Sequence, residues 1–360
     1  MKSMRAFSLA EVLIALIVMG VAGIAMMASL WMLSGLFTQT EEYSVAQQAI
    51  ETAFHAVGPQ ISNAGLGMPN NKEGQGSFAE SFYSSLTPPV MAMMGAEGQS
   101  WGGPVTLATS PDLKPGSFVT ATTTLPGGRT VYGGTVLYYA WSAPTGVRVR
   151  AVEFPGREIA QGDEVKLQFA DGDVGILESF QYDGREVGIS EKNSPAASHA
   201  STRRWITFPT VRAPFWLSGW DNGGTPGAGG SSQVNSAIAV MAPESRMSFN
   251  RLLSRYEEVH LVQACRLYLQ GDELIQEFFD TGIQPSDCTR KILAQGIVGL
   301  YFTFDPEKRL VTMYVAARGG NPRISEGSAP ADWPGFAPPL PAEARKYRIL
   351  TSTMRWRVRN

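Results

Sequence analysis

The hydrophobic pattern of this chain changes abruptly near residue 38. From Phe7 to Phe37 the sequence is apolar for 31 residues, and Glu11 is the only ionisable side chain within it. About 20 apolar residues already cross the hydrocarbon core of a bilayer as a helix. A carboxylate in such a segment costs about 2.5–3.5 kcal/mol at the bilayer centre and less near its edge, so we expect Glu11 to have a partner. The pattern therefore predicts a transmembrane helix over residues 7–37.

Beyond this run, apolar residues recur every three or four positions, which is typical of one face of a helix. This apolar stripe consists of Ala46, Ile50, Ala53, Val57 and Ile61, and the other face is assigned Glu41, Glu42, Gln47, Gln48 and Glu51. We expect residues 38–62 to continue the transmembrane helix, with Pro59 close to its end. Such a stripe needs an apolar partner, most simply a β-sheet.

After Gly65 the pattern favours short strands. Alternation from Val259 to Leu269 predicts one strand, and Gly271-Asp272 offers a turn into the next. Residues 297–304 and 310–316 are expected to pair across a type I turn at residues 305–308.

The final strand has an irregular pattern. Tyr347 and Ile349 have odd numbers, whereas Met354, Trp356 and Val358 have even numbers. One face of a strand cannot hold both sets, so we predict a bulge or break at Thr351–Thr353. The Gly- and Pro-rich segments 223–232 and 319–342 are interpreted as surface loops.

These elements predict an α+β fold, in which a long N-terminal α-helix, transmembrane and then amphipathic, packs on a β-rich globular head (residues 63–360). Roughly 300 residues approach the upper limit for one hydrophobic core, so one elaborate domain and two lobes both remain open. The chain of 360 residues has a net charge of −2 and only 17% charged residues. Nucleic acid is therefore not expected as a partner, because nucleic-acid-binding domains carry a basic stripe.

A basic leader precedes the apolar run. It contains Lys2 and Arg5 and ends in the small residue Ala6, directly before Phe7. The layout resembles the class III signal of type IV pilins and type II secretion pseudopilins. In that family a short basic leader ends in Gly or Ala, Phe is the first mature residue, and Glu is the fifth. Ala6, Phe7 and Glu11 occupy these positions, and residues 1–6 would be the prepilin leader.

The resemblance implies a specific processing pathway. A prepilin peptidase would cleave after Ala6 and methylate the amine of Phe7. Glu11 would then neutralise the amine of a neighbouring subunit during assembly. An ordinary signal peptide has an apolar region of only 7–15 residues and an Ala-x-Ala-like site, which this chain lacks. A plain signal anchor would account for the length of the apolar segment and for the upstream cations, but not for the carboxylate of Glu11 within that segment.

The distal sequence is similar to PilW-like minor pilins and J-type pseudopilins. The segments that carry this likeness are Ile61–Gly65, Asn235–Val240, Ile292–Ile297 and Arg355–Asn360. The resemblance implies a minor pilin, a structural or priming/tip subunit of a type IV pilus (fimbrium), with no enzymatic activity and no cofactor. Its partners would be prepilin peptidase, other pilin or pseudopilin subunits and the inner membrane, which it would cross once with an extracytoplasmic head. A minor pseudopilin of type II secretion is the alternative within the family, and a membrane-anchored hydrolase or ligand-binding protein is the alternative from another class.

No catalytic or metal site is expected. Residues 98–102 match the string G-x-S-x-G, but that motif needs a preceding strand and a following helix, so a surface loop is preferred. The three histidines, His55, His199 and His260, lack metal-ligand spacing. A turn is preferred over a calcium loop at residues 171–173.

Two further features are assigned to structure before function. Trp216, Trp220 and Asp221 beside a Gly-rich segment suit an adhesive tip, although loop packing is the simpler interpretation. Cys265 and Cys288 are expected to form a disulfide outside the cytoplasm, worth about 3 kcal/mol in the chain-entropy model. Two buried thiols acting as small hydrophobes are the open alternative.

Overall fold

The structure is a computed structural model. It describes residues 9–68, 103–109, 121–153, 158–159, 164–170, 173–182, 184–186, 205–209, 211–221, 236–241, 247–248, 257–279, 289–322, 327–328 and 330–359. Ala6, Phe7, Cys288 and residues 98–102 and 223–232 lie outside these ranges, so the predictions that depend on them stay predictions.

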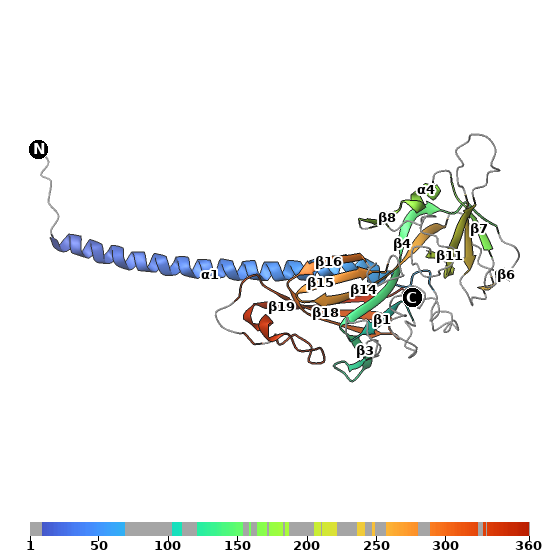
Figure 1. Ribbon diagram of the computed structural model, residues 1–360. Helices are drawn as coiled ribbons and strands as arrows, with labels where there is room; N and C mark the ends of the chain where they lie inside the picture. The colour runs from blue at the N-terminus through green and yellow to red at the C-terminus, as the bar shows by residue number, and fades with distance from the viewer. Residues whose placement is uncertain are drawn as a thin grey trace, which may run out of the picture.

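One helix dominates the molecule. Helix α1 (Leu9–Ser62) is continuous over 54 residues, which corresponds to about 80 Å at 1.5 Å per residue. Its first half projects from the head as a rod (Figure 1). All side chains from Leu9 to Glu41 are exposed, and burial begins at Glu42. Pro59 lies inside the helix rather than ending it, and its carbonyl accepts from the amide of Asn63 at 3.1 Å.

The head contains two main antiparallel sheets. The larger has ten strands, of which eight follow the order β1 (Val105–Ala108), β4 (Val136–Arg148), β14 (Glu258–Gln270), β10 (Trp205–Phe208), β11 (Val211–Asp221), β12 (Ser236–Met241), β7 (Glu164–Gln168) and β5 (Ala151–Glu153). Strand β14 also pairs with β15 (Glu273–Phe278), which pairs with β16 (Thr289–Gln295). The smaller sheet has the order β19 (Ile349–Arg357), β18 (Leu310–Arg318), β17 (Ile297–Asp305), β3 (Thr130–Gly134) and β2 (Ala121–Thr124). The expected α+β fold is confirmed.

Short elements complete the described part of the head. Two strand pairs are β6 (Glu158–Ile159) with β13 (Met247–Ser248), and β8 (Gln181–Tyr182) with β9 (Arg185–Glu186). The short helix α4 (Asp173–Glu178) contacts β4 in the upper part of the head (Figure 1), and the 3-10 helix η5 (Ala342–Lys346) precedes β19. Trp216, Trp220 and Asp221 belong to strand β11, so their assignment to a loop is wrong.

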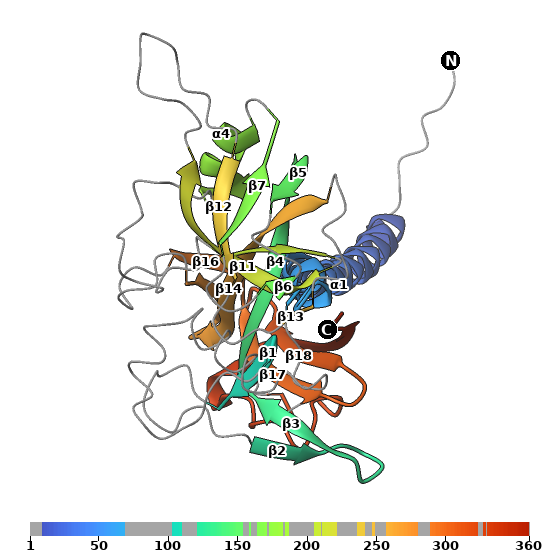
Figure 2. The ribbon, with the colours of Figure 1, turned by 90° about the vertical axis from the view of Figure 1, so that its right-hand side faces the viewer.

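The second half of α1 packs against both sheets, contacting β16 and β4 of the larger sheet and β18 and β19 of the smaller one. Figure 2 looks along the helix, with β17, β18, β3 and β2 below it. The predicted stripe is buried: Ala53, Val57 and Ile61 have no exposed surface. Phe54 meets Trp356 edge-on, with ring centroids 5.8 Å apart. Gly58 allows this approach, because a Cβ there would lie 2.9 Å from the Trp356 indole nitrogen.

Two predicted turns are confirmed. Gly271 joins β14 to β15 with φ of 63°, a conformation that favours glycine. Strands β17 and β18 pair across a turn at residues 306–309, one residue beyond the predicted bounds. There the Asp305 carboxylate accepts from the amides of Glu307 and Lys308 at 3.1 and 3.0 Å.

The predicted bulge at Thr351–Thr353 is wrong. Strands β18 and β19 pair in unbroken register from Ile349 opposite Arg318 to Arg357 opposite Leu310. The parity change has another cause, because different segments cover the two faces of β19. Ile349 packs on a small cluster that includes Leu340 and Ala344, while Trp356 on the opposite face packs on α1. The face that carries Ile349 is therefore apolar at the start of β19, and the face that carries Trp356 is apolar near its end.

Candidate functional site

The exposed half of α1 is the most unusual surface of the protein. Leu9, Ile24 and Trp31 expose 86%, 73% and 77% of their surface. Monomeric soluble proteins rarely expose a continuous apolar surface of this size. The helix is long and apolar enough to cross a membrane, which is compatible with single-pass anchoring.

Few polar side chains interrupt this surface, and three of its hydroxyls bond to carbonyl oxygens within the helix. Ser29, Thr38 and Thr40 donate to the carbonyl oxygens of residues 25, 34 and 36 at 2.9, 3.0 and 2.9 Å. This matters in an apolar environment, where an unsatisfied polar group costs several kcal/mol. Glu11 lies in the first turn of the described helix, with its residue exposed.

A cluster that we call the junction fixes the point where α1 enters the head. It consists of Glu42, Tyr43, Gly319 and Arg348. The Glu42 carboxylate lies 3.6 Å from the Arg348 guanidinium, which also lies over the Tyr43 ring at 5.1 Å. Gly319 contacts Glu42 so closely that a Cβ there would lie 2.9 Å from the Glu42 Cβ.

The assignment of Glu42 to the solvated face of the helix is wrong, because only 7% of its surface is exposed. Residue 42 precedes Ala46 by four positions and so lies on the apolar stripe. That spacing was the available sequence signal. The compensating cation, Arg348, comes from a segment 306 residues away and carries no recognisable pattern.

At the other end of the helix, a buried polar cluster links α1 to the larger sheet. Gln60 Oε1 accepts from Tyr139 Oη at 2.9 Å and from Gln276 Nε2 at 2.6 Å. Gln276 Nε2 also contacts Tyr139 Oη at 2.6 Å and the Cys265 sulfur at 3.5 Å. Burial raises the pKa of Tyr139 well above its ordinary value of 10, so the phenol stays protonated as a donor.

Cys265 is fully buried in the main core, which also contains Leu267 of the same strand. Cys288 lies outside the described residues, so the disulfide stays a prediction.

On the opposite face of the larger sheet lies a buried ion-pair cluster. Glu277 on β15 pairs with Arg266 on β14 and, at 2.9 Å, with Arg290 on β16. Tyr138 lies close to this cluster, and burial raises its pKa to about 12. The carboxylate thus joins three neighbouring strands and is compensated by two cations, as a buried charge requires.

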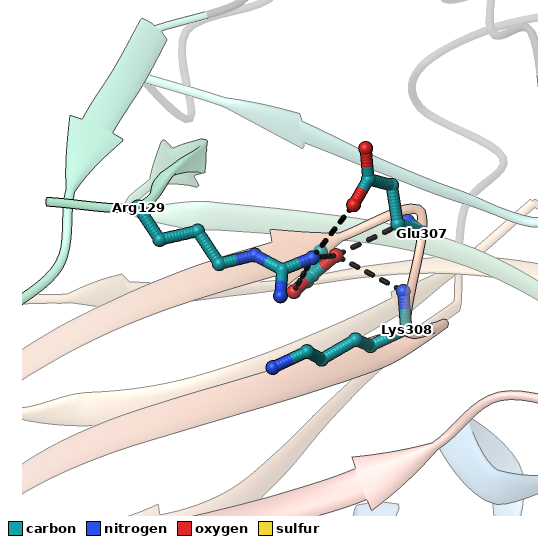
Figure 3. Close-up of polar contacts among 4 residues, drawn as sticks. Arg129, Glu307 and Lys308 are labelled. Atoms are coloured by element: carbon teal, nitrogen blue, oxygen red, sulfur yellow. Dashed lines mark hydrogen bonds and ion pairs between the residues drawn. The ribbon is translucent and has the colours of Figure 1, made fainter. Parts of the chain in front are cut away.

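A fourth polar cluster lies at the end of the smaller sheet, far from the junction. Arg129, which precedes β3, donates to the Asp305 carboxylate at 2.8 Å and contacts Glu307 at 3.0 Å (Figure 3). Asp305 also caps the β17–β18 turn, so this carboxylate is fully engaged. Lys308 is joined to Asp305 through its backbone amide, and no dashed line reaches its ammonium (Figure 3).

Two cavities of the head are lined by described residues. These neighbouring cavities, of about 240 and 320 Å³, share Thr135 and Pro338 and are otherwise lined mainly by apolar and aromatic side chains. Among the described residues, no group of three or more His, Cys, Asp or Glu side chains is placed to hold a metal ion. His260 is hydrogen-bonded through its ring Nδ1 to the Ser142 hydroxyl at 3.1 Å, and burial lowers the pKa of its imidazole. His55 is exposed, and His199 lies outside the described residues.

Comparison with protein-family models, curated proteins and solved structures finds no match to this chain.

Proposed function

We propose that this protein is a minor pilin, a structural or priming/tip subunit of a type IV pilus processed by prepilin peptidase. The observation that carries the proposal is the division of α1 into a bare apolar half and a docked half. A helix that only anchors a protein needs no rigid continuation into its head. A filament subunit needs one, because the rod must keep a fixed direction relative to the head as it moves from lipid into a protein core.

The docking contacts supply that rigidity. The junction holds the helix where it enters the head, Phe54 and Gly58 seat it on Trp356, and Gln60 anchors its end. These contacts are spread over about five turns, so they fix both the tilt and the rotation of the helix. The bare half therefore emerges from the head in one orientation.

Glu11 is the residue for which this proposal gives a role. In a filament core its carboxylate would pair with the methylated amine of Phe7 from a neighbouring subunit. Two unit charges 4 Å apart attract by about 4 kcal/mol at an effective dielectric constant of 20, compared with about 1 kcal/mol in water. The pairing would therefore strengthen when subunits bring both groups out of water. The same geometry suits a type II secretion pseudopilus, and recovery of the protein from each kind of filament would distinguish the two machines.

The processing step gives a first test. Membrane-extracted protein from cells with an active prepilin peptidase is digested, and the mass of its N-terminal peptide is measured. The proposal predicts a start at Phe7 with one added methyl group. A start near Ala28, or an uncut Met1, would contradict it, and a peptidase-deficient strain is the matched control.

A further inference from the structure

The end of the smaller sheet farthest from the junction is strongly cationic. Arg355, Arg357 and Arg359 alternate along β19 and just beyond it, and Lys308 and Arg309 lie in the neighbouring β17–β18 turn. We call these five residues the arginine edge. Successive strand residues point to opposite faces, so the three arginines lie on the face opposite Trp356, which packs on α1.

The charges of the arginine edge are not neutralised by nearby acids. Within the described part of the chain, Arg355, Arg357 and Lys308 are exposed and form no ion pair. The two carboxylates of the adjacent turn, Asp305 and Glu307, are both engaged by Arg129. Among the described residues, six cationic side chains, Arg129 included, therefore accompany the two carboxylates of this turn.

The position of the edge argues against a lipid partner. Strand β19 begins next to Arg348 of the junction, where α1 leaves the head, and runs away from it to Arg357 (Figure 1). Nine strand residues at about 3.3 Å each place the edge roughly 30 Å from the junction. A bilayer crossed by the bare half of α1 lies on the junction side.

The chemistry of the edge favours an acidic polypeptide over nucleic acid. Arginines at alternate strand positions are about 6.6–6.8 Å apart, which equals the spacing of alternate side chains in an extended partner. Guanidinium groups bind carboxylates with two parallel hydrogen bonds. Single-stranded nucleic acid also needs aromatic side chains for base stacking, and Trp356 is turned inward. Tyr301 and Tyr314 lie on the same face of the sheet as the arginines, but both rings already pack against Phe336.

We propose that the arginine edge binds an extended acidic segment of another protein, with carboxylates at alternate positions. The binding chemistry does not depend on the pilin assignment. Within a filament, the edge lies on the head surface away from the membrane, where a neighbouring subunit or a carried protein would meet it.

The test measures binding of labelled peptides to the full-length protein in a neutral detergent, by fluorescence anisotropy. The probe is a peptide of six Glu-Thr repeats, with six Gln-Thr repeats as the neutral match and a 12-nucleotide oligo(dT) as a different polyanion. The first variant is Arg355→Gln/Arg357→Gln/Arg359→Gln. The control Arg150→Gln/Arg345→Gln/Lys346→Gln removes the same charge from exposed positions elsewhere.

We expect the acidic peptide alone to bind, at least tenfold more weakly to the first variant and within twofold of wild type to the control. Near-ultraviolet circular dichroism checks folding. If the first variant misfolds, Arg355→Lys/Arg357→Lys/Arg359→Lys keeps the charge and is expected to bind severalfold more weakly, because lysine cannot form the paired hydrogen bonds. The proposal is overturned if wild type does not bind the acidic peptide, or if the first and control variants bind it equally. Equal affinity for oligo(dT) would make the edge a general polyanion site instead.

Discussion

Replacing Gln60 by Ala should loosen the end of α1 from the head. The change removes the oxygen that accepts from Tyr139 and Gln276. Those two side chains still contact each other at 2.6 Å, so one buried donor is left without its acceptor. An orphaned buried group costs about 1–3 kcal/mol, and the small cavity adds to this, for a total of about 2–4 kcal/mol. At about 2 °C per kcal/mol for a domain of this size, the melting temperature should fall by roughly 4–8 °C.

The assay is thermal unfolding of the full-length protein in neutral detergent, followed by circular dichroism. Gln48→Ala is the matched control, because Gln48 is exposed on the same helix. The double variant Gln60→Ala/Tyr139→Phe should lose less stability than the sum of the single variants, since it removes the orphaned hydroxyl as well. Equal melting temperatures for Gln60→Ala and Gln48→Ala, or strict additivity in the double variant, would refute the anchoring role.

Two further predictions follow from buried groups. The pKa of Tyr138 is about 12 in the folded protein against 10 in an unfolded chain, so its contribution to stability should be constant below pH 10 and should be lost as the pH rises from 10 to 12. Alkaline unfolding of Tyr138→Phe should lack this loss. Identical pH profiles of stability for the variant and wild type would contradict the prediction. Protein exported to an oxidising compartment should show no reactive thiol under denaturing conditions, because Cys265 and Cys288 are predicted to be joined. Two titratable thiols would disprove the disulfide and leave the pilin proposal unaffected.

The local periodicity of the sequence predicted α1 and the main hairpins well. Ala46, Ile50, Ala53, Val57 and Ile61 lie on the buried stripe because spacings of three and four are a direct consequence of helix geometry. The turns at residues 271–272 and 306–309 are also determined locally, by residue types that favour tight turns. Features of this kind need no knowledge of the rest of the fold.

Features that depend on a distant partner were missed. Glu42 was assigned to solvent because its cation, Arg348, belongs to the last strand connection. The parity change in β19 suggested a bulge because the sequence does not reveal that Ile349 is covered by residues 340–344. Gln60 gave no signal as an anchor, since its partners lie 79 and 216 residues away.

The central claim, that the bare half of α1 is a filament core segment, is tested most directly by incorporation of Glu11→Gln into filaments. Wild-type and variant proteins are expressed at equal level in cells that assemble the filament. Sheared filaments are then captured and the protein is quantified relative to its membrane pool. Cleavage between Ala6 and Phe7 should be normal, but the variant should be depleted from filaments at least severalfold, because the neutral amide cannot pair with a neighbour's amine. Equal incorporation of variant and wild type, or absence of wild-type protein from filaments, would contradict it.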